Sequence, residues 1–448
     1  MTDFVQSVAG VLIVALVLAL SIALHEIGHL VPAKRFGVKV TQYMIGFGPT
    51  LWSTRRGETE YGVKWLPLGG YIRMIGMFPP GAGEDATHLR ESSTGAFQTM
   101  AADARAVSAA EISPKDAERV FYRLPVPKKV VIMLGGPMMN LLIAVALLGV
   151  LLVGFGDPGQ RATTTTLSVV NECILPADST RTACGEGDPA TPAAEAGVRP
   201  GDRIVSFAGE PVTAWSDVRL AIRERSGAAT DMVVLRDGTE MTVSITPVET
   251  EVAALDVQGE VMLDAAGELQ TVTAGFIGVA PLTRLEPQPV TAVPGFVADT
   301  VVGTAGIVVR LPQRMVDVAQ ASFGSEDRDP NGPIGIVGVG RLAGEISSID
   351  EIELRDKAAG LLGLLGSLNV ALFVFNLVPL LPLDGGHVAG ALWEGLRRRI
   401  AFARGRKDPG PVDVAKALPI AYATSLLLVA MSVMLLYADI VRPISLRG

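Results

Sequence analysis

The chain has 448 residues, a mean hydropathy of +0.40 and only 19% charged residues, below the roughly 25% of ordinary soluble proteins. This balance argues against a soluble protein and predicts a membrane protein of several parts. The net charge of -8 shows no excess of basic residues that would bind nucleic acid. Two cysteines are too few for a disulfide scaffold or a four-cysteine zinc module.

Four stretches are long and apolar enough to cross a bilayer, which takes about 20 residues. They are Val5–Leu24, Val130–Phe155, Ala358–Leu383 and approximately Ala417–Ala438. A cleaved signal peptide is the alternative for the first stretch, but it lacks a basic start and a small-residue cleavage site. A fifth apolar stretch, Val290–Val309, contains Pro294 and Asp299, so we predict an interfacial amphipathic segment there rather than a span.

Loop charges predict the orientation of these spans, because Lys and Arg gather on the cytoplasmic side. Residues 31–129 carry 14 Lys/Arg against 9 Asp/Glu, whereas residues 157–290 carry 9 Arg against 20 Asp/Glu. A second basic run, from Arg397 to Lys416, follows the third span. We therefore predict a multi-pass protein of the cell membrane, with both basic segments in the cytoplasm and the acidic segment and both termini outside.

The loops between the spans carry their own patterns. Short alternating runs with Gly and Pro, at Phe36–Trp52 and Glu60–Met77, predict a hairpin sheet near the membrane face. The small polar residues of Pro79–Lys115 are typical of a flexible loop. In the acidic segment, Ala214–Arg225 has a helical apolar repeat, and Asp231–Val248 predicts a strand hairpin that turns at Asp237–Gly238.

A metal-binding pattern follows the first span directly. The pentapeptide HEIGH, His25 to His29, fits H-E-x-x-H, which places two imidazoles on one face of a helix. Two imidazoles suit zinc, and Glu26 can take a proton from a water molecule that zinc acidifies. A chance match is the alternative, but ionisable residues beside an apolar span are costly and usually functional. We therefore predict one zinc ion, with Glu26 as the catalytic base.

A catalytic zinc needs a third protein ligand. Asp384, in NLVPLLPLDGGHV at the end of the third span, is the first charge after Ala358, and such a carboxylate needs a partner. Pro379 and Pro382 would break the helix and let the chain approach the metal. The alternative is that Asp384 merely ends the span at the interface.

Other titratable residues receive plainer interpretations. His387 is an alternative ligand, but His25, His29 and Asp384 already leave one open position, so we assign it no ligand role. Glu58, Glu60 and His88 are interpreted as residues of solvated loops.

The chain resembles the site-2 proteases, the zinc metalloproteases that cut inside membranes. HEIGH and NLVPLLPLDGG resemble the two metal-binding motifs of this family. IGFGP at Ile45–Pro49, PLGGY at Pro67–Tyr71 and GGPMMN at Gly135–Asn140 resemble the bacterial branch, which carries an inserted PDZ domain. The resemblance covers nearly the whole chain.

The resemblance implies roles for particular residues. His25, His29 and Asp384 would be the zinc ligands and Glu26 the catalytic base. Asn376 would engage the substrate backbone. The Phe36–Met77 region, with Gly69 and Gly70, would present the substrate as an added strand. A transmembrane helix must unwind first, because its amides are paired internally.

The resemblance also implies one PDZ domain, over about Ala162–Pro281, with AAEAGVRPGDRIVSFAGEPV as its strongest match and GFIGVAP as its closing strand. Asn171–Pro192 and Glu249–Glu268 depart from the pattern as insertions. The domain could bind a peptide or act as a steric filter. Cys173 and Cys184, both in the first insertion, form a disulfide in our hypothesis, since an oxidising compartment outside the cell would permit one.

These observations predict an α-helical membrane protein of four spans, with a membrane-associated β region and one extracytoplasmic PDZ-like α+β domain. The predicted parts are a first transmembrane helix (1–30), a cytoplasmic-side β region and loop (31–128), a second helix (129–156), the PDZ-like domain (160–283), an amphipathic region (288–356), a third helix (357–387), a basic cytoplasmic loop (388–416) and a fourth helix (417–440).

The predicted function is intramembrane zinc proteolysis in the bilayer, with the active site towards the cytoplasm. The predicted substrates are pre-cleaved single-span proteins such as an anti-sigma factor, and no nucleic acid is involved. Clearance of remnant signal peptides is an alternative with the same chemistry. A non-enzymatic membrane metal carrier or scaffold is an alternative of another class. It would need acidic or His residues on several spans, and the first, second and fourth spans carry no internal charge.

Overall fold

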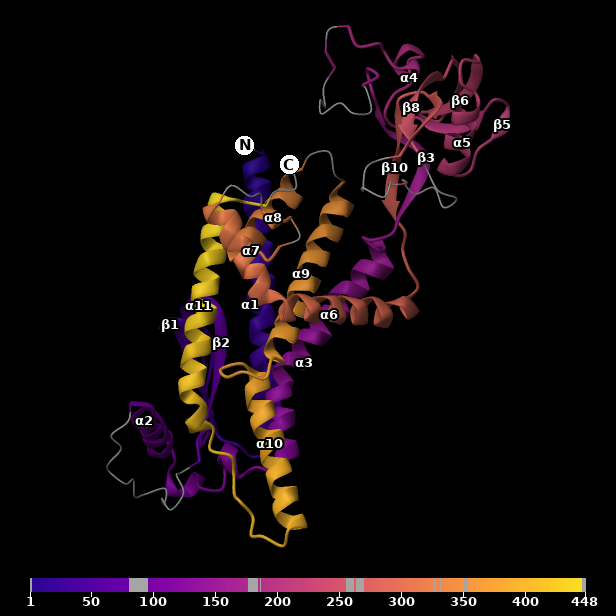
Figure 1. Ribbon diagram of the computed structural model, residues 1–448. Coiled ribbons are helices and arrows are strands. Elements are labelled where there is room, and N and C mark those ends of the chain that lie inside the picture. Colours follow the sequence, from indigo (N-terminus) through magenta and orange to yellow (C-terminus); the bar gives the residue numbers. More distant parts are fainter. Residues whose placement is uncertain are drawn as a thin grey trace. The chain divides into compact units, whose positions relative to one another are not determined.

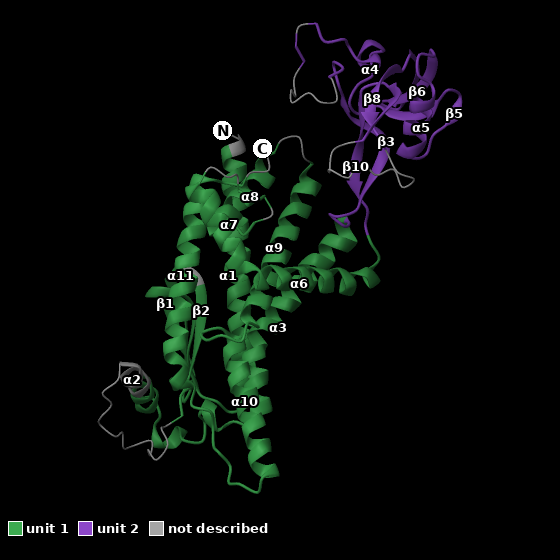
Figure 2. Ribbon diagram, in the orientation of Figure 1, with its two compact units in different colours: residues 1–155, 288–448 green, residues 156–287 purple. Residues whose placement is uncertain are grey.

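Two units make up the chain, and Figure 1 shows the elements of both. The computed structural model describes residues 2–79, 96–175, 184–185, 187–254, 262, 270–324, 328–330, 332–349 and 353–444. Unit 1 combines residues 1–155 with residues 288–448, and unit 2 is the intervening segment 156–287 (Figure 2). Unit 2 thus extends a few residues beyond both ends of the domain predicted from the sequence, residues 160–283.

Helices form most of unit 1. They are α1 (Thr2–Arg35), α2 (Ala96–Ala110), α3 (Val126–Val150, continued by the π-helical turn η3, Leu151–Phe155), α6 (Val293–Val309), α7 (Leu311–Phe323), α8 (Ile336–Ser348), α9 (Leu354–Asn376), α10 (Asp384–Ala403) and α11 (Leu418–Val441). Short 3₁₀ turns lie at Pro114–Asp116, Phe121–Arg123, Val290–Ala292 and Val414–Ala417. Helix α3 is central, because it packs against α1, α9 and α10. Its contact with α1 is very close: a Cβ added at Gly135 would lie 1.9 Å from the Gly28 carbonyl oxygen.

Five of the described helices are long and apolar enough to cross a membrane, whereas the sequence predicts four spans. They are Phe4–Arg35, Val126–Phe155, Val290–Val309, Leu354–Asn376 and Val414–Val441. The additional helix contains α6, which is apolar on nearly all sides, so the amphipathic character predicted for it is not found. In Figure 2, α6 runs across α3 and α9. Its interfacial placement stays a prediction.

Two predicted loops contain helices. The predicted third span corresponds to α9, which ends at Asn376, before Pro379 and Pro382. Helix α10 begins at Asp384, so most of the predicted basic loop 388–416 is helical. Ala, Leu, Glu and Arg are strong helix formers, and here they outweigh the run of charges. Likewise α2 lies within the predicted flexible loop Pro79–Lys115, because its sequence is Ala-rich. His88 lies outside the described residues.

The predicted hairpin sheet is confirmed, and it has four runs from two long strands. Strand β1 spans Val40–Arg56 and β2 spans Thr59–Met74. Residues 60–63 lie between residues 52–55 and 42–45 and pair with both. Residues 70–74 pair with residues 40–45, on the side away from residues 60–63. Gly46 and Gly69, with φ of 92° and 101°, allow the bends that produce this arrangement. Residues 70–74 therefore form an edge of the sheet.

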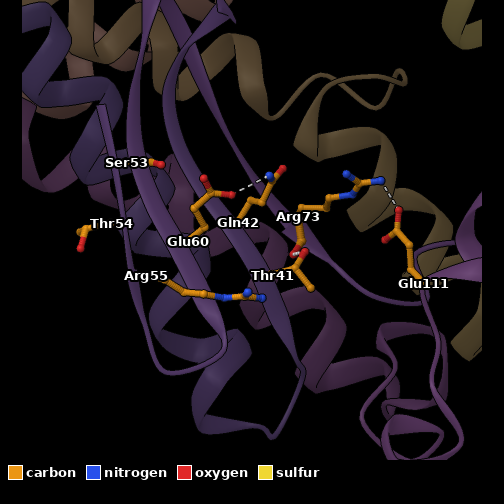
Figure 3. A pocket seen from close by; sticks show the side chains of 8 residues that line it. All are labelled: Thr41, Gln42, Ser53, Thr54, Arg55, Glu60, Arg73 and Glu111. Atoms are coloured by element: carbon orange, nitrogen blue, oxygen red, sulfur yellow. Dashed lines mark hydrogen bonds and ion pairs between the residues drawn. The ribbon is translucent and has the colours of Figure 1, made fainter. Parts of the chain in front are cut away.

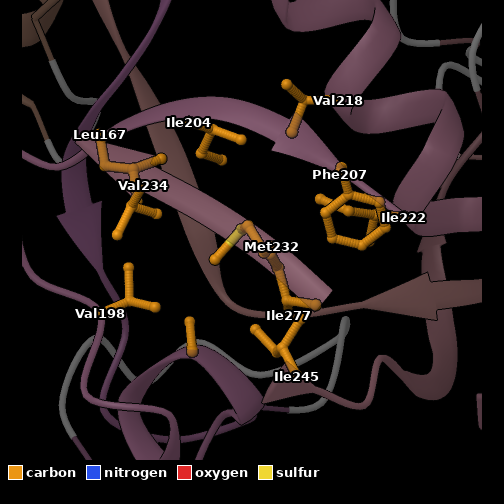
Figure 4. Packing of buried hydrophobic residues seen from close by; sticks show 11 residues of the cluster. Leu167, Val198, Ile204, Phe207, Val218, Ile222, Met232, Val234, Ile245 and Ile277 are labelled. Atoms are coloured by element: carbon orange, nitrogen blue, oxygen red, sulfur yellow. The ribbon is translucent and has the colours of Figure 1, made fainter. Parts of the chain in front are cut away.

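Unit 2 is a small α+β domain. Its main sheet has the order β10 (Val279–Leu285), β3 (Arg161–Val170), β4 (Arg203–Phe207), β6 (Thr230–Arg236) and β7 (Thr239–Ile245), with β5 (Glu210–Pro211) beside β4. Strands β8 (Val248–Ala253) and β9 (Thr271–Phe276) pair separately, and the helices are α4 (Pro192–Glu195) and α5 (Trp215–Glu224). Figure 4 shows the core, in which Phe207 and Met232 are fully buried.

Three local predictions in unit 2 are confirmed. Helix α5 lies within the segment that has the helical repeat. Strands β6 and β7 form a hairpin that turns at Asp237 and Gly238, whose positive φ angles of 50° and 81° suit a tight two-residue turn. Cys173 and Cys184 form a disulfide with a Cα–Cα distance of 5.9 Å, as hypothesised.

A buried ion pair stabilises unit 2. Asp202, only 1% exposed, accepts hydrogen bonds from Arg236 at 2.7 and 2.6 Å and from the Arg199 amide at 2.9 Å. Burial by itself would raise the pKa of Asp202, but the hydrogen bonds from Arg236 and Arg199 outweigh it and hold the pKa below its usual value. The carboxylate therefore contributes stability above its unfolded-state pKa near 4, and this contribution is lost as the pH falls through the lower folded-state pKa.

Replacing Asp202 with alanine should lower the free energy of unfolding of unit 2, because Arg236 and the Arg199 amide would lose their common acceptor. Hydrogen exchange at the amides of β6, measured in the full-length protein, would report the change. The matched control is Asp231→Ala, an exposed residue of the same strand. The protection of these amides, relative to the exchange rate of an unstructured chain at the same pH, should fall below about pH 4 in the wild type, and the variant should lose this dependence. Equal protection in the variant and wild type would contradict the prediction.

Candidate metal centre

Three donor atoms from two distant parts of the chain converge in unit 1. His25 and His29 lie one turn apart on α1, with their Nε2 atoms 3.2 Å apart. Asp384 is the first residue of α10, and its Oδ2 atom lies 3.3 Å from each Nε2. The breaks at Pro379 and Pro382 separate α9 from α10 and so place Asp384 at a helix start. The structure thus brings together the three residues that the sequence singles out as ligands.

The arrangement fits a tetrahedral zinc ion. With zinc–ligand bonds of about 2.0–2.1 Å, two ligand atoms at a tetrahedral site lie about 3.3–3.4 Å apart, close to the separations of 3.2 and 3.3 Å found here. Asp384 Oδ2 is buried and has no hydrogen-bond donor among the described residues, although a buried carboxylate oxygen needs one or a metal. Three protein ligands also leave one position open, as in catalytic zinc sites.

Helix α3 forms the wall of this centre. A Cβ added at Gly136 would lie 2.2 Å from His29 Nε2 and 2.7 Å from His25 Nε2, so only glycine leaves the space free. The Nδ1 atom of His29 lies 2.7 Å from the Ile132 carbonyl oxygen, which orients this ring. The Nδ1 atom of His25 lies 3.1 Å from Nδ2 of Asn140, a residue one turn after Gly136. None of these wall residues was assigned a role from the sequence, although the spacing of Gly136 and Asn140 places both on one helix face.

The sheet edge formed by residues 70–74 lies beside Glu26. This carboxylate is only 8% exposed, and the Ile72 backbone N–H forms a hydrogen bond with it. A Cβ added at Gly70 would lie 2.9 Å from Glu26 Cγ, so glycine permits this close approach. Tyr43 donates a 2.8 Å hydrogen bond to the Ala23 carbonyl and thereby fixes β1 to α1. Burial and the nearby Glu26 carboxylate raise the pKa of Tyr43 to about 12, so the hydroxyl keeps its proton.

The remaining predicted residues lie outside the cluster of three donors. Asn376 is half-buried and ends α9, and Gly69 bends β2 just before its edge residues. His387 is not part of the cluster of three donors found among the described residues, and its lack of a ligand role stays a prediction. Glu58, interpreted as a residue of a solvated loop, lies in the turn between β1 and β2 and pairs with Arg119 at 2.6 and 2.7 Å. These hydrogen bonds hold the pKa of Glu58 below its usual value.

A polar cavity of about 530 Å³ lies on the sheet, and no metal-centre residue lines it (Figure 3). Glu60, interpreted as a residue of a solvated loop, lies instead on β2 and accepts a 3.1 Å hydrogen bond from Gln42 there. Arg73, on the sheet edge, forms an ion pair with Glu111, which follows α2.

A buried ion pair attaches α10, the helix that carries Asp384, to α3. Lys129 Nζ lies 2.9 and 2.8 Å from the two carboxylate oxygens of Glu394, and both residues are at most 4% exposed. The Val412 amide also donates to Glu394, at 3.1 Å. Such a pair contributes little net stability, but it fixes which surface of α10 faces α3.

Apolar helices that carry a two-histidine, one-carboxylate site define a membrane-embedded metalloprotease as the class of protein. A family model, peptidase family M50, matches residues 13–415, and the chain therefore belongs to this family, the site-2 proteases. It is similar to the zinc metalloprotease Rip1 of Mycobacterium bovis, with 33% identity over 98% of this chain and 99% of the relative. It is also similar to Rip1 of Mycobacterium tuberculosis, with 34% identity over the same shares. The metalloprotease MmpA of Caulobacter vibrioides is 28% identical over 86% of each chain. The chain is thus a zinc metalloendopeptidase.

Proposed function

We propose that this enzyme hydrolyses peptide bonds within transmembrane segments, with one zinc ion held by His25, His29 and Asp384. The observation that carries the proposal is the convergence of the three donor atoms at 3.2–3.3 Å between helix α1, which is apolar enough to span a bilayer, and the start of α10. A carrier or scaffold is less well supported, because the described residues contain a single such cluster rather than a series of sites along several helices.

Glu26 is the catalytic base in this proposal. When bound, zinc acts as a Lewis acid that acidifies a water molecule and polarises a peptide carbonyl. Glu26 accepts the proton of that water and delivers it to the amine of the leaving strand. Its burial limits access of bulk water, and its place on α1 directly after His25 would hold its carboxylate near the bound metal.

The substrate joins the sheet as an added strand in this proposal. Residues 70–74 offer an edge, and their backbone passes Glu26 at Gly70 and Ile72. A helix cannot bind in this way, because its amides are already paired, so the segment must unwind first. Gly69 and Gly70 allow the close approach of the two backbones, and Asn376 hydrogen-bonds the substrate backbone from the end of α9.

The natural substrates are single-span proteins already trimmed outside the membrane, such as an anti-sigma factor. Remnant signal peptides would suit the same chemistry. The charge balance of the loops supports a cell-membrane location, with the metal centre towards the cytoplasm and unit 2 outside. Unit 2 is a PDZ-like domain in this proposal, either a peptide-binding module or a filter that rejects substrates with large external domains.

A reconstituted cleavage assay tests the proposal. The full-length enzyme and a trimmed single-span substrate are placed in the same vesicles, and mass spectrometry identifies the new chain ends. We expect a cut inside the apolar span that stops on zinc chelation and resumes when zinc is restored. Cuts confined to the soluble flanks, or equally fast cleavage of a soluble peptide with no span, would contradict the proposal.

A further inference from the structure

Asn140 is a buried amide in direct contact with a proposed zinc ligand. It lies on α3, is 1% exposed, and its Nδ2 atom is 3.1 Å from His25 Nδ1. Its other polar atom, Oδ1, is buried and has no hydrogen-bond partner among the described residues. The side chain is therefore committed to a single contact, the one with His25.

This contact is not explained by stability. A buried polar atom without a partner costs about 1–3 kcal/mol, and an apolar side chain of similar shape would avoid that cost. Asn140 also lies in an otherwise apolar stretch of α3, between Met139 and Leu141. An amide at this position is therefore more consistent with a role at the metal centre than with packing.

The chemistry of imidazole indicates what that role is. His25 Nε2 faces the other two donor atoms, so this nitrogen must offer its lone pair to the metal. The ring proton then resides on Nδ1, which becomes a donor and requires an acceptor. A half-turn of the Asn140 amide exchanges its oxygen and nitrogen at nearly unchanged positions and places Oδ1 opposite Nδ1.

We propose that Asn140 is a positioning residue for zinc, whose Oδ1 accepts the Nδ1–H of His25 and so fixes the tautomer and plane of that ring. The Ile132 carbonyl does the same for His29, at 2.7 Å. Helix α3, which supplies no ligand, thus orients both imidazoles. This inference rests on the proposed zinc ligands and extends them to the outer partners, whose loss typically weakens metal binding by about 10–100-fold.

Zinc affinity of full-length variants tests the role, measured by competition with a chromophoric chelator. We expect Asn140→Leu to bind zinc about 10–100-fold more weakly, because Leu offers no acceptor. Asn140→Asp keeps an acceptor oxygen and should restore affinity to within about threefold of wild type, a difference of less than 1 kcal/mol. The absorption spectrum of the cobalt-substituted enzyme should change in the Leu variant, since the ring of His25 would turn.

A matched control separates positioning from packing. Asn369, on α9, is also 1% exposed and also has an unpaired Oδ1, but its Nδ2 donates to the Leu365 carbonyl within its own helix. Asn369→Leu should leave zinc affinity unchanged, and melting of the metal-free variants would register any packing effect. Unchanged zinc affinity in Asn140→Leu would overturn the inference, as would an Asp variant as weak as the Leu variant. His25→Ala tests the ligand set itself: retained zinc there would refute the proposed function instead.

Discussion

A methyl group added at position 136 should prevent zinc from binding to an otherwise folded enzyme. In Gly136→Ala the new Cβ would lie 2.2 Å from His29 Nε2 and 2.7 Å from His25 Nε2, closer than non-bonded atoms approach. The imidazoles must then move apart, and the three-donor geometry is lost. Since the loss of mere outer partners costs about 10–100-fold, we expect zinc affinity to fall by more than about 100-fold. Peptide hydrolysis should fall with it.

Metal analysis of the purified variant, together with the vesicle cleavage assay, measures both effects. Gly149→Ala is the matched control, because it lies on the same helix and its added Cβ would meet nothing closer than Val293 at 3.6 Å. The control should bind zinc and cleave as the wild type does. A Gly136→Ala enzyme with full zinc content would show that α3 does not form the wall of the metal site.

The second large effect concerns Glu26. Glu26→Gln should reduce the rate of cleavage by about 10²–10⁴-fold, the usual contribution of a positioned general base, while zinc content stays at the wild-type level. Glutamine has nearly the same shape but cannot accept the proton, and Glu26 is not among the three clustered donors.

Asp384→Ala provides the contrast for this prediction, because it removes a donor and should lose zinc and activity together. Single-turnover cleavage with metal analysis of the same samples distinguishes the two variants. A Glu26→Gln enzyme that cleaves as fast as the wild type would refute the role of the base, even with the ligand set intact.

Much of the fold was predictable because its signals are local. Long apolar runs predicted the helices around α1, α3, α9 and α11, and an Asp–Gly pair predicted the turn between β6 and β7. Errors arose where local signals conflict. The arginines of α10 suggested a loop, and the proline, aspartate and small residues in and around α6 suggested an amphipathic segment, whereas α6 is apolar on nearly all sides. The doubled pairing of residues 60–63 depends on which runs meet in space, which alternation of residue types does not encode.

Only part of the metal centre could be predicted from the sequence. Two histidines and an isolated carboxylate stand out because ionisable groups are costly beside apolar spans. Gly136 and Asn140 stand out only as members of the GGPMMN motif, to which no role was assigned, and Ile132 belongs to an ordinary apolar run. Their roles depend on the backbone carbonyl of Ile132, the missing side chain of Gly136 and the distance of Asn140 from His25. All three follow from how α3 packs against α1.

The ligand set also has a consequence for how the chain can change over evolution. The centre joins α1 to the start of α10 and so closes a loop of about 350 residues, within which unit 2 is a self-contained insertion of about 130. The entropy of loop closure grows only with the logarithm of length, so deleting that unit would alter the cost of assembling the centre by only about 0.4 kcal/mol. The insertion can therefore be lost, duplicated or exchanged with almost no effect on the assembly of the metal site, so the substrate selection proposed for unit 2 can diverge while the metal site stays constant.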